Sequence, residues 1–125
     1  MTIPADQINT AAEWWTFQLR RSAKVSSDQA DLFESTLRDL LPAHLEKTWD
    51  PNEPIAGSSE RCLLLPGGVL SVAAKAAGIP TKCPPFPKAT TMWINPDAVK
   101  VQYGLGKRIV CLWARKVLSD KGGAE

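Results

Sequence analysis

Several residue types that catalytic and exported proteins rely on are scarce in this chain of 125 residues. It holds one histidine, His44, and three scattered cysteines, Cys62, Cys83 and Cys111, none of them in a CxxC pair. An odd number of separated cysteines predicts reduced, buried thiols rather than a disulfide framework. Because no second histidine and no clustered cysteine or carboxylate accompanies His44, the sequence also predicts no metal site.

Long apolar runs are absent as well. No window approaches the roughly 18 apolar residues that a membrane span needs, and the opening MTIPADQINT lacks the basic start and apolar core of a signal peptide. Hydrophobic residues make up 44% of the chain and charged residues 22%, which is the composition of a globular protein. We therefore expect one packed, soluble domain in the cytoplasm, without membrane contact.

Charge is unevenly distributed, although the formal net charge is only +2. Residues 1–60 hold ten acidic and five basic residues, whereas residues 61–125 hold three acidic and ten basic ones. The two halves could compensate each other within the fold, or the second half could attract an anion such as nucleic acid. The basic residues are scattered, with no run of Lys or Arg longer than two, which favours the first interpretation.

The apolar pattern predicts two helices in the first 47 residues. Thr10 precedes Glu13 at the spacing of a capping box, which predicts a helix over about residues 11–21 with a broad apolar face. Ser26 and Gln29 have the same spacing and predict a second helix that reaches about residue 47. Pro42 should kink this helix or divide it in two.

The rest of the chain predicts a loop, a further helix and four strands. Residues 49–60 are rich in Pro, Gly, Ser and Asn and predict a loop. RCLLL predicts a short strand, and VLSVAAKAAGI a helix that ends at Gly78. TMWI, AVKVQY and KRIVCLWA predict three antiparallel strands, because their connections are too short for helical crossovers.

This order, helix, helix, strand, helix and three strands, gives an α+β fold in which a helical layer packs on one face of a small, mostly antiparallel sheet. We expect a single domain over residues 1–118 and a flexible tail over residues 119–125.

Catalytic motifs are missing from the sequence. A hydrolase needs a nucleophile within hydrogen-bond reach of a base, and His44 stands alone in an amphipathic helical pattern. GLGKR, residues 104–108, is not a phosphate loop, because that motif requires Ser or Thr after the lysine and a helix after the loop. The sequence therefore predicts a protein that is not an enzyme and holds no cofactor.

Tryptophan, by contrast, is abundant, with five in the chain. Trp49 and Trp93 each adjoin a proline-containing corner, and Trp is the residue most enriched at binding hot spots. The rigid pair Asn95-Pro96 separates two strand-like segments. We expect this corner to turn one strand into the next and to leave Trp93 at the edge of a binding face.

Two segments resemble the conserved boxes of the BTG/Tob antiproliferative domain family. The W-P-P-G-R order of the first box is matched at the same intervals by Trp49, Pro51, Pro54, Gly57 and Arg61. The second box is similar to FPKATTMWINPDAVKVQYG, with its tryptophan, proline corner and final glycine. With the apolar residues that precede Trp49, the resemblance covers roughly residues 30–112.

The resemblance implies an α+β domain without enzymatic activity that binds a DEDD-type poly(A) deadenylase through surfaces of both boxes. By position, Trp93 would be the binding tryptophan, and Asn95 stands at the corner where the family has aspartate. Glu60 takes the place of the family's binding tyrosine. Replacing an aromatic anchor by a carboxylate removes apolar area and adds a desolvation cost, so this departure bears on the partner rather than on the fold.

A second resemblance concerns the ends of the chain. The segments AAEWWTFQLR, TMWI and KVQYGLG are similar to small proteins of unassigned function carried by phages and prophages. This resemblance implies a protein that binds and inhibits a host factor.

Our leading hypothesis is a non-catalytic protein-binding module, an adaptor or an inhibitor of a host protein such as a nuclease. Its partner-binding residues would be Trp93, Asn95, Pro96 and Glu60, while the residues matched to the first box would be mainly structural. The alternative is a nucleic-acid-binding protein with contacts from Lys100, Lys107, Arg108, Arg115 and Lys116.

Overall fold

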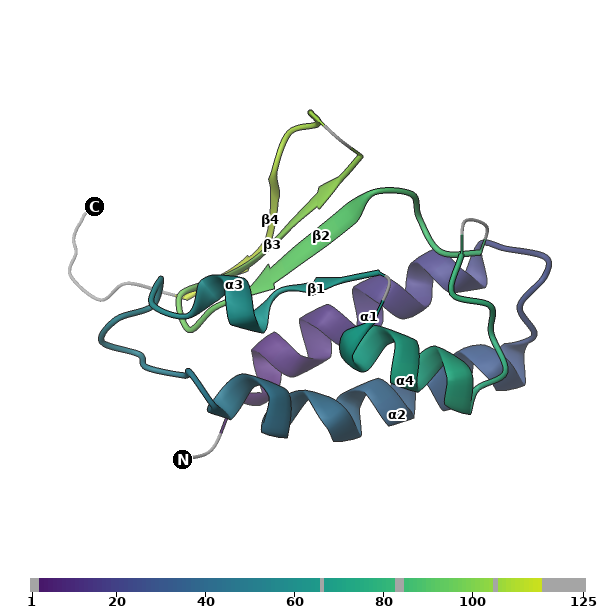
Figure 1. The fold of residues 1–125 in the computed structure, drawn as a ribbon, viewed down its shortest axis with the longest axis horizontal. Helices are drawn as coiled ribbons and strands as arrows, with labels where there is room; N and C mark the ends of the chain where they lie inside the picture. Colours follow the sequence, from purple (N-terminus) through teal and green to yellow (C-terminus); the bar gives the residue numbers. More distant parts are fainter. Residues whose placement is uncertain (1–2, 66, 83–84, 105, 116–125) are drawn as a thin grey trace.

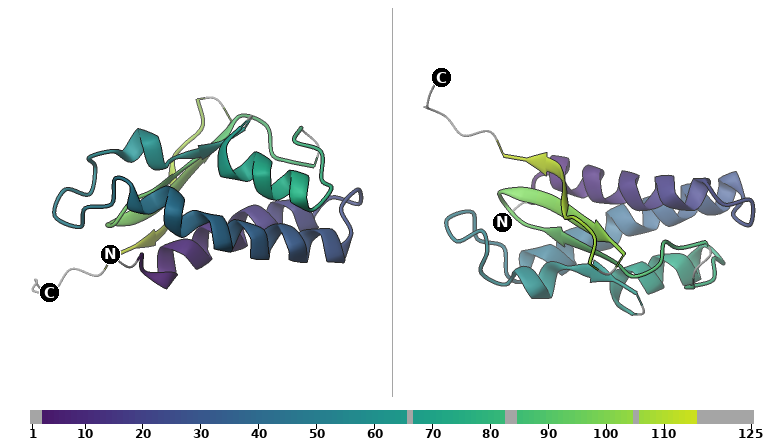
Figure 2. Two further views of the ribbon diagram at one scale, coloured as in Figure 1. Left: turned by 60° about the horizontal axis from the view of Figure 1, so that its bottom comes forward. Right: turned by 90° about the horizontal axis from the view of Figure 1, so that it is seen from above.

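Helices and strands form separate layers in the part of the chain that the structure, a computed structural model, describes, namely residues 3–65, 67–82, 85–104 and 106–115. The helices are α1 (Ala5–Arg20), α2 (Ser27–Glu46), α3 (Ser58–Arg61) and α4 (Gly68–Ala76). The strands β1 (Leu63–Leu64), β2 (Thr90–Ile94), β3 (Ala98–Tyr103) and β4 (Val110–Ala114) are antiparallel neighbours in that order. Figures 1 and 2 show α1, α2 and α4 along one side of this sheet. The predicted α+β architecture is confirmed.

Helix α1 begins earlier than the sequence predicts. It starts at Ala5, directly after Pro4, and Thr10 lies inside it. The Thr10 hydroxyl donates to the backbone oxygen of Asp6 at 2.7 Å, one turn back, instead of capping a helix start. The predicted capping box at Thr10 is therefore wrong, because Ser and Thr side chains within a helix can bond to the preceding turn equally well.

Helix α2 begins where the sequence predicts. The backbone N–H of Gln29 donates to Ser26 Oγ at 3.1 Å, and the backbone N–H of Ser26 donates to Gln29 Oε1 at 2.9 Å, which completes a capping box. The helix continues through Pro42 to Glu46 as one element, so the predicted division does not occur. Leu41 and Leu45 are fully buried around the proline and hold this turn to the core.

The core lies between the helices and the inner face of the sheet. On β2, Met92 and Ile94 are fully buried, while Thr91 and Trp93 alternate with them and are half-buried. Side chains from α1 and α2, among them Trp15, Leu19, Phe33 and Leu37, fill the space below. This alternation gives the sheet an inner face that packs on helices and an outer face that carries Trp93.

Other boundaries refine the prediction. The expected loop over residues 49–60 contains the start of α3, which is the one described helix that the sequence pattern did not predict. Helix α4 ends at Ala76, and Gly78 follows with a φ of 71°, the left-handed conformation expected at a helix end. The predicted tail over residues 119–125 lies outside the described residues. Among the helices of the described ranges, none has the length and apolarity needed to cross a membrane.

Candidate functional site

A buried guanidinium stands at the centre of the region formed by the two boxes. Arg61, at the end of α3, has no exposed surface. Its N–H groups donate over 2.6–3.0 Å to the backbone oxygens of Thr48, Pro54, Ala56 and Ile94 and to the side-chain oxygen of Asn95. One side chain thereby joins the end of α2, the following loop and the end of β2.

No carboxylate accepts a hydrogen bond from Arg61 among the described residues. Burial lowers the pKa of the Arg61 guanidinium, and the charges of Asp97 and Glu60 oppose this shift. A buried cation is costly unless its donors are all paired, so the ring of carbonyl oxygens is what makes this position tolerable.

Two further box residues close around Arg61. Trp49 is 5% exposed, and its ring centroid lies 5.8 Å from the guanidinium carbon, within cation–π range. Gly57 has a φ of 75°, and a Cβ atom there would lie 2.6 Å from Thr48 Cβ and 3.1 Å from Arg61 Nη1. Only glycine fits this position without displacing the network.

The Asn95-Pro96 corner belongs to the same network. Asn95 is 7% exposed, accepts from Arg61 Nη2 at 2.8 Å and donates to Ser58 Oγ at 3.1 Å. Its backbone exchanges hydrogen bonds with Ala98 at 2.9 and 3.2 Å, which closes the turn from β2 to β3. The Pro96 carbonyl accepts from Gln7 Nε2 of α1 at 3.2 Å.

Burial corrects the expected roles of two residues. Asn95 and Pro96 are both buried, so they hold the corner and offer little exposed surface to a partner. Trp93 is half-buried on the outer face of the sheet, and Glu60 is exposed on α3, which packs against β2. These two remain available for contact.

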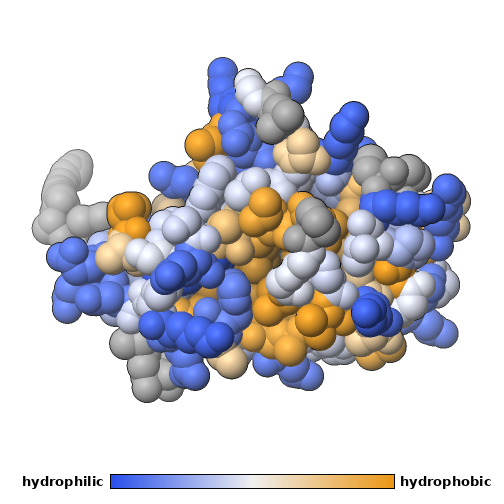
Figure 3. All heavy atoms as spheres, viewed as in Figure 1, coloured by the Kyte–Doolittle hydropathy of each residue, from blue (hydrophilic) through white to orange (hydrophobic). Residues whose placement is uncertain are grey.

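The outer face around Trp93 also carries an apolar residue that the sequence analysis missed. Trp93 pairs with Lys100 on β3, and the neighbouring Thr91 pairs with Leu64 on β1. Leu64 is 45% exposed. Figure 3 shows apolar surface over β1 and over the neighbouring α4, which lies on the helix side of the sheet and carries Val72, 54% exposed. RCLLL reads as one continuous apolar run, so no alternation in the sequence indicated which leucine faces out.

The structure does not gather the predicted basic residues into one cluster. Lys100 lies on the outer face, Lys107 and Arg108 precede β4, and Arg115 follows it at the other end of the strand. Arg115 Nη1 donates to the Pro51 carbonyl at 3.2 Å. Lys116 lies outside the described residues. This spread gives no continuous track for a phosphate backbone.

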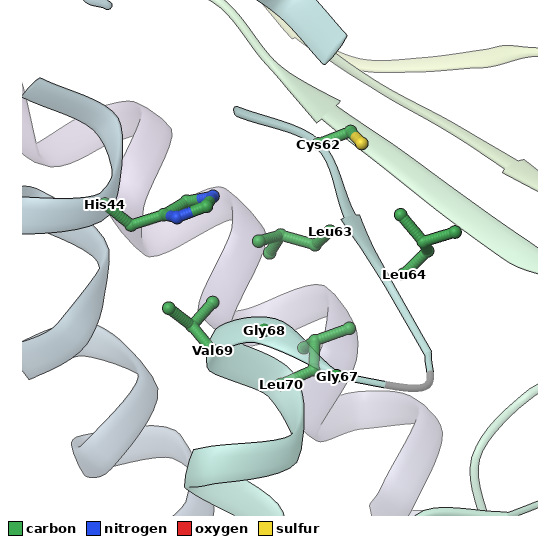
Figure 4. A pocket seen from close by; sticks show the side chains of 8 residues that line it. All are labelled: His44, Cys62, Leu63, Leu64, Gly67, Gly68, Val69 and Leu70. Atoms are coloured by element: carbon green, nitrogen blue, oxygen red, sulfur yellow. The ribbon is translucent and has the colours of Figure 1, made fainter. Parts of the chain in front are cut away.

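A small cavity of about 140 Å³ separates the two side chains best suited to catalysis (Figure 4). His44 Nε2 is buried without a hydrogen-bond partner in the described chain, and burial lowers the pKa of His44. The Cys62 sulfur is turned away from His44 and donates to the Ser59 carbonyl at 3.0 Å, and burial raises the pKa of the Cys62 thiol. This arrangement does not activate a thiol nucleophile.

The cysteine prediction holds only in part. Cys62 and Cys111 are free thiols, but Cys62 is half-buried and Cys111 is exposed on the edge strand β4, so the expectation of buried thiols is wrong for both. Cys83 lies outside the described residues. Within the described ranges, no three His, Cys, Asp or Glu side chains are grouped as a metal site would require.

Comparisons with known proteins agree with the fold. A model of the BTG family matches residues 5–113. Protein BTG2 of Rattus norvegicus is 28% identical over 122 residues, which span 94% of this chain and 77% of that protein. Protein Tob2 of Homo sapiens is 33% identical over 86 residues, 65% of this chain and 25% of that protein. A solved BTG/Tob domain of C. elegans FOG-3 superposes with a TM-score of 0.73 at 19% identity, covering 88% of this chain and 82% of that one.

The close packing at Gly57 predicts a difference between two alanine substitutions. Gly57 and Gly106 have φ values of 75° and 73°, but nothing lies within 4 Å of a Cβ at Gly106. Gly106→Ala should lower the free energy of unfolding by about 1–2 kcal/mol, the backbone cost alone. Gly57→Ala should lower it by clearly more, since Thr48 must also move. Urea unfolding of both variants measures this, and equal losses would contradict tight packing around Arg61.

The half-buried imidazole of His44 predicts a pH dependence of stability. The unfolded chain binds the proton at the ordinary pKa of about 6.5, whereas burial lowers the pKa of His44 in the fold. His44 therefore contributes stability above pH 6.5 that is lost as the pH falls through the lower, folded pKa. Urea unfolding at pH 7.5 and 5.5 should show a smaller loss for His44→Gln than for the wild type. If the free energy of unfolding falls equally in both proteins between pH 7.5 and 5.5, His44 does not cause the pH dependence.

Proposed function

The chain belongs to the BTG family, and from this premise we propose that it is a non-catalytic module that binds a partner protein in the cytoplasm through the outer face of its sheet. Members of this family are regulatory proteins that bind protein partners and are not enzymes.

The proposal rests on the position of Trp93 next to the hydrogen-bond network of Arg61. Trp93 follows fully buried Met92 and precedes fully buried Ile94, whose carbonyl accepts from Arg61 at 3.0 Å. Its backbone is thus held rigidly, while half-burial leaves part of the ring to solvent. A rigid, partly exposed tryptophan loses little conformational entropy on binding and can fill a pocket on a partner.

The surroundings of Trp93 support a protein partner over nucleic acid. Leu64 adds exposed apolar area on the same face, and Lys100 and Glu60 place charges of opposite sign near it. Apolar centres with a mixed polar rim are typical of protein interfaces. The dispersed basic residues give nucleic acid no comparable site.

Substitution of Trp93 tests this interface. Trp93→Ala should weaken partner binding by about 2 kcal/mol or more and leave the melting temperature nearly unchanged. Trp113→Ala is the matched control, because Trp113 is also half-buried but packs against the core. It should lower stability and leave the binding of the folded fraction unchanged. A large stability loss with Trp93→Ala and no loss of binding would refute the interface.

The first partner to test is a DEDD-type poly(A) deadenylase, to which the resemblance of the two boxes points. Calorimetry with the purified nuclease and the variant Glu60→Tyr examines the position where this sequence departs from the box. An aromatic side chain there removes the desolvation cost of the carboxylate and should tighten binding. Nuclease assays on the complex distinguish an adaptor, which leaves activity intact, from an inhibitor. Binding that weakens steeply with salt and prefers RNA or DNA would instead favour nucleic acid.

A further inference from the structure

A second apolar surface lies at the other edge of the sheet, between α1 and β4. Thr10, Glu13, Trp14 and Phe17 of α1 and Leu112 of β4 line an open groove of about 380 Å³, which we call the α1–β4 groove. Phe17 is 59% exposed there. A large aromatic side chain held so far into solvent has no role in the core.

Trp14, which lines the groove, is held in place by a buried neighbour. Trp14 packs edge-on against fully buried Trp15, with ring centroids 5.0 Å apart, and lies 6.1 Å from the Tyr103 ring at the end of β3. Tyr103 is 52% exposed, so the aromatic surface continues beyond the groove. Contiguous exposed apolar patches of this kind mark interaction sites.

Strand β4 gives the groove a backbone edge. It is the last strand of the sheet and pairs only with β3 among the described strands. No second described strand pairs with its outward N–H and C=O groups, which can therefore bond to an extended chain. Such a chain would place alternate side chains against the aromatic residues of α1, which is the geometry of strand addition beside a side-chain pocket.

Basic residues flank both elements that line the groove. Lys107 and Arg108 precede β4, and Arg21 follows Phe17 by one helical turn. All three are exposed, and no ion pair between described residues involves them. The single carboxylate in the lining, Glu13, is already paired with Arg38 at 3.2 Å. An occupant with carboxylates would match this charge pattern.

A second copy of this chain fits the edge poorly. Antiparallel pairing of two β4 strands would bring Arg108 of one copy towards Arg115 of the other, and like charges opposite each other are unfavourable. Val99 pairs with Trp113 and Lys100 with Cys111, so Leu112 is an extra residue in a bulge. The bulge interrupts the regular ladder and so disfavours pairing along the whole of β4 with a second copy, whereas a short extended segment needs only a few regular positions.

We propose that the α1–β4 groove binds an extended segment of a partner protein in which apolar residues alternate with acidic ones. The site is independent of the Trp93 face, which lies near β1 at the opposite edge of the sheet. Binding at one surface can therefore be removed while the other is retained.

Selection from a displayed random peptide library against the full chain tests the proposal. The enriched peptides should alternate apolar and acidic residues. Binding of a synthetic copy of the best peptide should weaken about tenfold or more with Phe17→Ser. It should also weaken with Arg108→Glu. Ile55→Ser is the matched control, because Ile55 is 69% exposed outside the groove, and it should leave binding unchanged, as should Trp93→Ala.

Several results would overturn the proposal. One is that every selected peptide binds the wild type and Phe17→Ser equally well. Another is that the enriched peptides contain no acidic residues. A wild-type dimer that Phe17→Ser dissociates would assign the groove to a second copy. Binding to phosphatidylserine vesicles that Phe17→Ser abolishes would assign it to a membrane. Because Trp93→Ala is measured in parallel, failure here is distinguishable from failure of the proposed interface at Trp93.

Discussion

The structure around the two boxes depends on one buried cation. Arg61 is fully buried and donates to backbone or side-chain oxygens of five residues drawn from the loop that follows α2, from β2 and from the corner after β2. Hydrogen bonds to a charged group contribute about 1.5–3 kcal/mol each, but only together do they offset the desolvation of the guanidinium. Loss of one acceptor therefore weakens the position of every segment that the network joins.

This network connects the residues of the first box with the half-buried tryptophan of the second box. Trp49 and Gly57 shape the space that Arg61 occupies, and Asn95 extends the network into the turn after β2. Trp93 lies two residues before that turn, on the outer face. Four of the residues that look functional by their spacing are therefore buried supports, namely Trp49, Arg61, Asn95 and Pro96.

Much of the fold could be predicted from the sequence, because periodicity and caps are local signals. Ser26 and Gln29 marked the start of α2 correctly, and TMWI predicted a strand where β2 lies. Thr10 failed as a cap because its hydroxyl bonds within the helix instead. The burial of Asn95 and the exposure of Leu64 and Phe17 could not be predicted from the sequence, because burial depends on which distant segments cover a residue.

We infer that Arg61 holds the loop and the corner that position Trp93. Amide hydrogen exchange of residues 49–61 and 93–98, compared between the wild type and Arg61→Lys, tests it most directly. A lysine ammonium has three donors and cannot bridge the same five residues. We predict faster exchange in both segments while buried amides of α2 stay protected. Unchanged protection in residues 93–98 would contradict the account, because the corner would then hold its position without Arg61.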